Sequence, residues 1–359
     1  MSDTFDAPSA PIPLPGQRPG DAPPLRSATP DPNLLLSVVV PCYNEQEVLP
    51  ELLRRVRAAC DRTVPERYEI VLVNDGSRDR TASMIADASL GDPAVVGVDL
   101  ARNYGHQIAL TAGLSFARGM RILVMDADLQ DPPELLPDMM ALMDRGANVV
   151  YGRRTDREGE TLFKRATARM FYRLLNRLAH VQIPMDTGDF RLIDRRTLDA
   201  FLSMPEQFRF IRGMIAWIGL NQVEIPYARQ ARYAGTTNYP LFKMIAFALD
   251  AFLGFSLAPL RLSLYLAIGF IVLACGLMGY VLVSYFLFST VRGWSSTLMM
   301  FLAFSSLQLL ALAVIGEYVG RTYLQTKQRP LFIVRDVYAK SRPRTAGQRP
   351  PSPDSGHVA

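Results

Sequence analysis

The chain has 359 residues, of which 49% are hydrophobic and 20% are charged. This composition favours a folded protein with a membrane part over a wholly soluble one. The net charge of +5 suits anionic lipids or phosphates, but it does not call for nucleic acid as a partner. The three cysteines have neither C-x-x-C nor metal-binding spacing, so we expect reduced thiols in a protein that faces the cytosol.

Residues 1–33 are rich in Pro, Ala, Asp and Ser and lack an apolar segment, which indicates a disordered tail and not a signal peptide. Strands and helices then alternate along the chain. The apolar pattern predicts strands at 34–40, 68–73, 94–100, 121–125 and 148–151. This alternation predicts an α/β domain with a parallel sheet and helices on both faces.

The segment 121–134 reads R-I-L-V-M-D-A-D-L-Q-D-P-P-E and combines a buried strand with a group of carboxylates. Asp126, Asp128 and Gln130 project to the same side of an extended segment, because side chains alternate with period two. Open α/β sheets bind ligands at the carboxyl ends of their strands, and Mg²⁺ or Mn²⁺ prefers oxygen ligands. The pattern therefore favours a metal site, and the alternative is a solvated acidic turn.

Polar residues also follow the other expected strands, among them Tyr43, Glu45, Asp75 and Asp79. Several such loops at one sheet edge are typical of a binding site. No G-x-G-x-x-G follows the first strand, and the sequence has no G-x-x-x-x-G-K-[ST] motif. These absences disfavour dinucleotide oxidoreductases and P-loop NTPases.

The second half of the chain has the pattern of a membrane-associated protein. Residues 158–180 predict a basic amphipathic helix on the membrane surface, or alternatively a helix packed on the domain with a solvated arginine face. The apolar segment 241–257 suits a helix in the membrane interface. Residues 262–288 and 297–316 contain no charged residue, so we predict two transmembrane helices. The flanking basic residues predict that the α/β domain and both termini lie in the cytoplasm.

Taken in order, these motifs resemble those of the GT-A-fold family 2 glycosyltransferases, in particular the polyprenyl-phosphate branch. That branch includes dolichyl-phosphate mannosyltransferase and the bacterial undecaprenyl-phosphate glucosyltransferases. The matching stretches are S-V-V-V-P-C-Y-N-E (37–45), V-N-D-G-S-R-D-R-T (73–81), R-N-Y-G-H-Q (102–107), M-D-A-D-L-Q-D-P-P-E (125–134), V-V-Y-G-R-R (149–154), D-T-G-D-F-R-L-I-D-R (186–195) and R-Y-A-G-T-T-N-Y (232–239). The resemblance implies a GT-A fold, Rossmann-like with a mostly parallel sheet, followed by interfacial helices and a two-helix membrane anchor.

The resemblance also implies roles for individual residues. The nucleotide sugar would be held by Pro41, Tyr43, Glu45, Asp75 and Asp126. The Mg²⁺ or Mn²⁺ ion that bridges the donor diphosphate would be held by Asp126, Asp128 and Gln130. The lipid phosphate and the diphosphate would be gripped by Arg153, Lys164, Arg165, Arg169 and Arg232. The catalytic group would comprise Asp128, Asp189 and Arg232.

Some roles stay open at this point. Asp189 is either a base or orienting residue or the cap of a turn, and His106 either fixes its loop or touches phosphate. Asn74 stands where the family often has aspartate, and Asn238 stands where it usually has lysine.

We therefore predict an inverting transfer of a sugar, with UDP-glucose favoured, to polyprenyl phosphate at the cytoplasmic face of the plasma membrane. The alternatives are GDP-mannose or another donor with the same acceptor, or a processive synthase, which the missing Q-x-x-R-W motif disfavours. A membrane-anchored scaffold is a further alternative. Homo-oligomers are possible. The predicted organisation is a tail (1–33), a GT-A domain (34–240), a juxtamembrane helix (241–260), a transmembrane hairpin (261–321) and a cytoplasmic tail (322–359).

Overall fold

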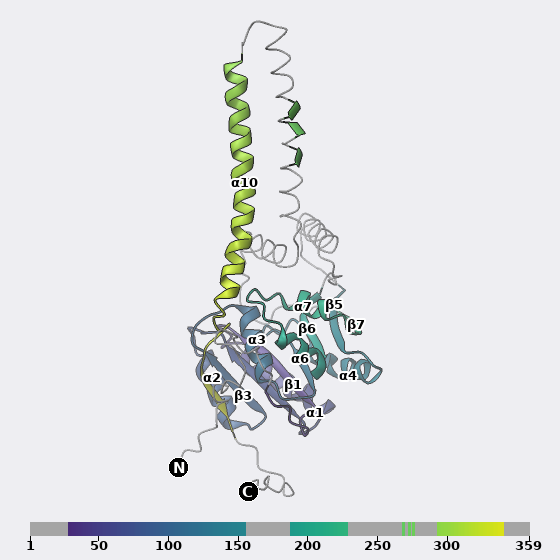
Figure 1. Ribbon diagram of the computed structural model, residues 1–359. Coiled ribbons are helices and arrows are strands. Elements are labelled where there is room, and N and C mark those ends of the chain that lie inside the picture. The colour runs from purple at the N-terminus through teal and green to yellow at the C-terminus, as the bar shows by residue number, and fades with distance from the viewer. Residues whose placement is uncertain are drawn as a thin grey trace, which may run out of the picture.

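The computed structural model describes residues 28–155, 187–228, 268–269, 272–273, 275–276 and 293–340. These residues form an α/β domain and a long helix, α10, that extends away from it (Figure 1). The strands are β1 (Leu36–Cys42), β2 (Tyr68–Asn74), β3 (Val95–Leu100), β4 (Arg121–Val124), β5 (Val149–Arg154), β6 (Thr187–Asp194), β7 (Gln222–Tyr227) and β8 (Val334–Ala339). The helices are α1 (Leu49–Thr63), α2 (Thr81–Gly91), α3 (His106–Phe116), the short 3-10 helix η1 (Pro133–Leu135), α4 (Leu136–Asp144), α6 (Arg195–Ser203), α7 (Ile211–Ile218) and α10 (Trp294–Thr326).

Strands β3, β2, β1 and β4 form the parallel centre of a sheet with the order β7-β5-β6-β4-β1-β2-β3-β8. Successive side chains of a strand point to opposite faces, so the centre contributes to two apolar layers. Val38 and Val40 pack in the layer that contains α1 and α4, whereas Val39 packs in the layer that contains α3, α6 and α7. The predicted α/β architecture with helices on both faces is confirmed.

The sheet is mixed, and two strands run against the parallel centre. Strand β6 lies between β4 and β5 and is antiparallel to both, and β8 is antiparallel to β3. The predicted, mostly parallel sheet is therefore parallel at its centre and mixed overall, because β6 and β8 run in the opposite direction. An apolar strand pattern does not encode direction, which is decided by the partners that the strand finds.

Helix α10 is the part of the described chain that could cross a membrane. Its segment Ala303–Thr326 has 24 residues and a mean hydropathy of 1.4, and among the described residues it is the one helix that is long and apolar enough. The predicted span 297–316 lies within α10, which continues beyond it to Thr326. In this last part of the helix, Arg321 forms an ion pair with Glu317 (Nε–Oε1 2.9 Å). Only six residues of the predicted span 262–288 are described. The predicted helices 158–180 and 241–257 lie outside the described residues.

The chain returns to the sheet after α10. Strand β8 pairs with β3 at the edge of the sheet, where we predicted a cytoplasmic tail and no strand (Figure 1). At the other end of the chain, Ala28 and Asp31 donate backbone hydrogen bonds to the carbonyls of Ser115 (2.8 Å) and Arg118 (3.0 Å). The last residues of the predicted N-terminal tail thus contact the end of α3 and the loop that follows it.

Candidate active site

The candidate site lies where the parallel strands end, at the carboxyl edge of the sheet. Asp75 follows β2 directly, and Asp126 follows β4. Asp189 reaches the same edge from the opposite direction, because it stands near the start of the antiparallel strand β6. Val124 pairs with Arg191 in the β4–β6 register, and continuing that register by two residues places Asp126 opposite Asp189. The antiparallel pairing therefore brings together two carboxylates that are far apart in the sequence.

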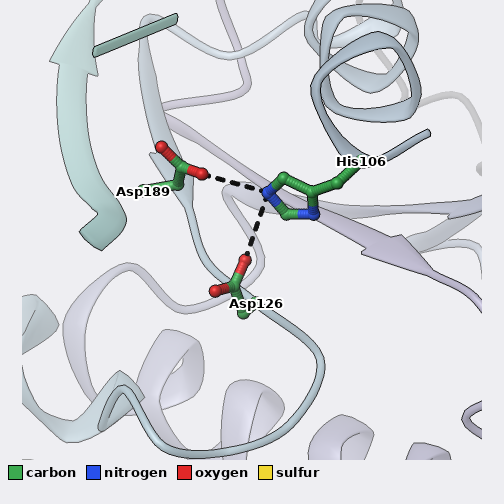
Figure 2. Close-up of side chains that lie close together, drawn as sticks. All are labelled: His106, Asp126 and Asp189. Atoms are coloured by element: carbon green, nitrogen blue, oxygen red, sulfur yellow. Dashed lines mark hydrogen bonds and ion pairs between the residues drawn. The ribbon is translucent and has the colours of Figure 1, made fainter. Parts of the chain in front are cut away.

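His106 lies between these two carboxylates (Figure 2). Its Nε2 atom is 3.0 Å from Oδ2 of Asp189 and 3.5 Å from Oδ1 of Asp126. The ligand atoms of the three residues all lie within 4.8 Å of one another, which is compatible with a shared metal ion. His106 is held here as the first residue of α3, after Gly105, whose φ of +91° favours glycine. The side chains of His106 and Asp126 are 41% and 30% exposed, so a ligand can reach them from solvent.

Asp189 is the buried centre of a polar network. Besides His106, it accepts hydrogen bonds from Gln107 (Nε2–Oδ2 3.1 Å) and from both Nε and Nη2 of Arg212 (2.8 and 3.3 Å). Burial alone would raise the pKa of Asp189. The charge of Arg212 and the hydrogen bonds from His106 and Arg212 outweigh this effect and hold its pKa well below the usual range. Asp189 is therefore an ionised carboxylate whose lone pairs are occupied.

The pKa values of the other two residues move because they share this network. Desolvation lowers the pKa of His106, but its hydrogen bond to Asp189 and the negative charge of Asp126 dominate and raise that pKa to about 9. Desolvation raises the pKa of Asp126 to about 6, against the opposing effect of His106. The Oδ1 atom of Asp126 is buried and accepts no hydrogen bond within the described part of the chain. A cation beside this oxygen would satisfy it.

Asp128 and Gln130, the other predicted metal ligands, lie in the turn after β4. The backbone N–H of Gln130 donates to Oδ1 of Asp128 (3.2 Å), and Leu129 between them has a positive φ of 58°. Asp131 is buried next in line, where the Tyr227 hydroxyl donates a short hydrogen bond to its carboxylate. This contact joins the acidic turn to β7.

The predicted nucleotide-binding residues occupy two neighbouring loops. Asp75 is buried, and its carboxylate accepts hydrogen bonds from the backbone N–H groups of Tyr104 (2.7 Å) and Gly105 (3.0 Å). The loop after β1 is fixed to the loop after β2, since the N–H of Glu45 donates to Oγ1 of Thr81 (2.8 Å). Pro41 is buried in β1, and Tyr43 is 42% exposed beyond its end. The four predicted residues thus lie at the same sheet edge as Asp126.

Of the five predicted phosphate-binding residues, the structure describes only Arg153. Arg153 stands on β5, where its Nε atom pairs with Glu224 Oε2 of β7 at 3.0 Å. The other four lie outside the described residues: Lys164, Arg165, Arg169 and Arg232.

Sequence reasoning left several residues of this network out of the site. Arg212 and Gln107 contact Asp189 directly, and His106 was assigned no definite role. Two of the three stand in the motif R-N-Y-G-H-Q, which was the available signal. Arg212 belongs to α7 and has no motif of its own, so only the packing of that helix reveals its role.

Comparison with known proteins shows the family of the chain. Residues 37–202 match the family described as Glycosyl transferase family 2. The chain is 47% identical to the uncharacterized glycosyltransferase YkcC of Bacillus subtilis (strain 168), over 84% of this chain and 94% of that protein. It is 37% identical to the prophage bactoprenol glucosyl transferase homolog of Escherichia coli (strain K12), over 84% of this chain and 99% of that protein. It is 36% identical to the bactoprenol glucosyl transferase of Shigella phage SfV, over 85% of this chain and 99% of that protein. Because these similarities extend over nearly the whole length of the relatives, the chain is a glycosyltransferase and belongs to glycosyl transferase family 2.

Proposed function

We propose that this chain transfers glucose from UDP-glucose to the phosphate of a polyprenyl phosphate, with inversion at the anomeric carbon. The observation that carries the proposal is the cluster of Asp126, His106 and Asp189 at the sheet edge of a glycosyltransferase. The names of the relatives from Escherichia coli and Shigella phage SfV support the lipid acceptor and the sugar. Helix α10 supports an enzyme that works at a membrane.

Asp126 is the residue best suited to hold a divalent cation, Mg²⁺ or Mn²⁺. Its buried Oδ1 atom has no hydrogen-bond partner in the described residues, and carboxylate oxygens are the ligands that these ions prefer. We assign Asp128 and Gln130 as its partners in the same turn, with His106 and Asp189 on the other side of Asp126. A cation bound here would neutralise charge on the departing nucleoside diphosphate.

Asp189 acts as a positioning residue in this proposal, and not as a general base. Its low pKa and its occupied lone pairs leave it little capacity to accept a proton. The acceptor needs no strong base, because a phosphate monoester with a second pKa of about 6 is largely dianionic at neutral pH. Asp189 instead holds the cationic groups of Arg212 and His106 towards the site, where they stabilise the phosphates.

The proposal also assigns the nucleotide-binding residues, the phosphate contacts and the membrane topology. Nucleotide sugar binds at Pro41, Tyr43, Glu45 and Asp75. The basic residues Arg153, Lys164, Arg165, Arg169 and Arg232 remain proposed contacts of the phosphates. We also propose two transmembrane helices in the plasma membrane, with the catalytic domain and both termini on the cytoplasmic side. The proposed domain limits are kept, except that α10 continues to Thr326 and β8 (Val334–Ala339) belongs to the sheet of the α/β domain.

The test uses the full chain in detergent with Mg²⁺ or Mn²⁺ and a short-chain polyprenyl phosphate. Labelled UDP- and GDP-sugars are offered one at a time, and transfer of label into the organic phase is counted. We expect UDP-glucose to yield an acid-labile glycolipid. Labelling by a different donor would correct the sugar and keep the acceptor. Hydrolysis or polymer formation without any labelled lipid would overturn the acceptor.

A further inference from the structure

The pairing of strand β8 with β3 contains an irregularity in its register, and this irregularity sets the direction of the Arg335 side chain. In its antiparallel pairing with β3, Asp99 stands opposite Asp336 and Leu100 stands opposite Val334. Arg335 is therefore the additional residue of a β-bulge. Bulges turn a side chain away from the regular alternation of the strand.

Arg335 is directed to the buried carboxylate of Asp99. Its Nη1 atom donates to Oδ2 of Asp99 (3.2 Å), and its Nη2 atom donates to the carbonyl of Ala101 (2.8 Å). The other oxygen of Asp99, Oδ1, accepts a hydrogen bond from Nδ2 of Asn74 (2.6 Å). Asp99 thus lies between a cation from the last strand and the amide that ends β2.

Asn74 continues the series into the loops at the sheet edge. Its Oδ1 atom accepts a hydrogen bond from the N–H of Ser77 (3.1 Å). The hydroxyl oxygen of Ser77 in turn accepts from the N–H of Asn44 (3.0 Å). Both ends of the Asn74 amide are therefore occupied, which fixes its orientation and that of the turn that begins with Asp75.

We propose that Arg335 and Asp99 are positioning residues of the nucleotide site, acting through Asn74 on the loops after β1 and β2. The proposal rests on the function proposed above, in which Asp75 and its neighbours bind the nucleotide. The asparagine at position 74 fits this arrangement, because its amide can donate to Asp99. An aspartate there would place a second carboxylate against Asp99, at the position where the amide now donates.

The experiment measures the dissociation constant of UDP in the presence of Mg²⁺, by calorimetry on the full chain in detergent. If the wild type uses a GDP-sugar in the donor panel, GDP replaces UDP. Arg335→Gln is the primary variant, because the Arg335 side chain is 55% exposed and its loss leaves the core intact. We expect the dissociation constant and the donor KM to rise about threefold to tenfold, with kcat little changed.

Two further variants test the direction of the effect. Asn74→Asp should weaken UDP binding on the order of tenfold, because two carboxylates then face each other. Arg335→Lys should restore part of the affinity, since it keeps the charge near Asp99. The matched control is Lys340→Gln, which removes a positive charge just after β8. The Lys340 Nζ atom contacts only the carbonyl of Gly91 (3.4 Å) among the described residues, so binding should not change.

The outcomes separate this inference from the function on which it rests. Asp75→Ala should abolish UDP binding if the nucleotide site is where we place it. If Asp75→Ala abolishes binding and Arg335→Gln leaves it unchanged, the positioning role of Arg335 is overturned and the site assignment stands. If neither variant changes binding, both are overturned. A lower unfolding midpoint in Arg335→Gln at constant affinity would indicate a structural role alone, and it also overturns the inference.

Discussion

Asp189 decides how the groups of the candidate site are oriented. It is ionised and buried, and it holds a histidine, a glutamine and an arginine that come from two different helices. Residues that orient reacting groups or metal ligands typically account for roughly 10- to 100-fold in activity or affinity. The effect of Asp189 on catalysis should therefore be large even though it is not assigned to proton transfer.

We predict that Asp189→Asn lowers kcat by roughly 10- to 100-fold, because the amide cannot hold both Arg212 and His106 as the carboxylate does. The assay is transfer of labelled glucose into the lipid phase. Asp199→Asn is the matched control, since Asp199 is a half-exposed carboxylate on α6 that pairs with Arg195 at 3.9 Å. An Asp189→Asn enzyme as active as the Asp199→Asn enzyme would remove Asp189 from the site.

We predict that Asp126→Asn abolishes the binding of Mn²⁺, because an amide oxygen is a poorer ligand than a carboxylate. Electron paramagnetic resonance of Mn²⁺ titrated into the full chain measures this without requiring turnover. The turn variant Asp128→Ala, measured in parallel, tests the second proposed ligand, and His106→Gln tests whether the network around Asp189 supports the ion. Unchanged Mn²⁺ affinity in Asp126→Asn would contradict the metal assignment.

The sequence was informative about some of these residues and not others. Asp126 could be predicted, because D-A-D after an apolar strand is a local pattern that places oxygen ligands at a sheet edge. Its proximity to Asp189 could not be predicted, because it depends on the antiparallel register of β4 and β6. Arg212 depends on the packing of α7 and has no local signal at all.

At the scale of the elements, α3 is packed unusually closely against the sheet. A Cβ atom on Gly113 would lie 2.4 Å from Cγ1 of Val39 and 2.8 Å from Cγ2 of Val73. The glycine therefore allows α3 to approach β1 and β2. Because His106 is the first residue of α3, this approach sets the position of its imidazole.

We predict that Gly113→Ala lowers the free energy of unfolding by about 1–3 kcal/mol, the usual cost of overpacking a core. Thermal unfolding of the full chain in detergent measures the change. Gly91→Ala is the control, because a Cβ atom on this last residue of α2 would have no neighbour within 4 Å. Equal midpoints for the two variants would show that the layer can expand at no cost.

The elements themselves were predictable to different degrees. The central strands are apolar on both faces and alternate with helices, which is a strong pattern for a parallel sheet. Strand β8 was missed because V-R-D-V-Y-A is short, contains two charged residues, as an edge strand can, and follows a helix that points away from the domain. Its place depends on a contact with β3 that is distant in the sequence.

At the scale of the whole molecule, the end of α10 is attached to the catalytic domain. The Gln325 side chain donates to the carbonyl of Pro205 (2.6 Å) and accepts from the N–H of Gln207 (2.9 Å). The Arg321 guanidinium lies 4.7 Å from the centre of the Phe208 ring. Pro205, Gln207 and Phe208 belong to the loop that leads into α7, and α7 carries Arg212. The apolar helix and the candidate site are therefore only one short helix apart.

We predict that a chain ending at residue 333 aggregates during purification, whereas a chain ending at residue 340 behaves as the full chain does. Without β8 the N–H and C=O groups of β3 form an open sheet edge, which is a template for association. Size-exclusion chromatography in one detergent compares the two truncations. Monodisperse protein from both would show that β3 tolerates exposure.

The return of the chain to the sheet also determines how a fragment for crystallisation can be designed. Cutting before α10 to obtain a detergent-free enzyme discards residues 334–339, and with them Arg335, the cationic partner of Asp99. The strands of the catalytic domain are not contiguous in the sequence, because α10 lies between β7 and β8, although all eight strands form one sheet. A water-soluble version therefore needs the eighth strand fused back through a linker, and a single stop codon does not produce it.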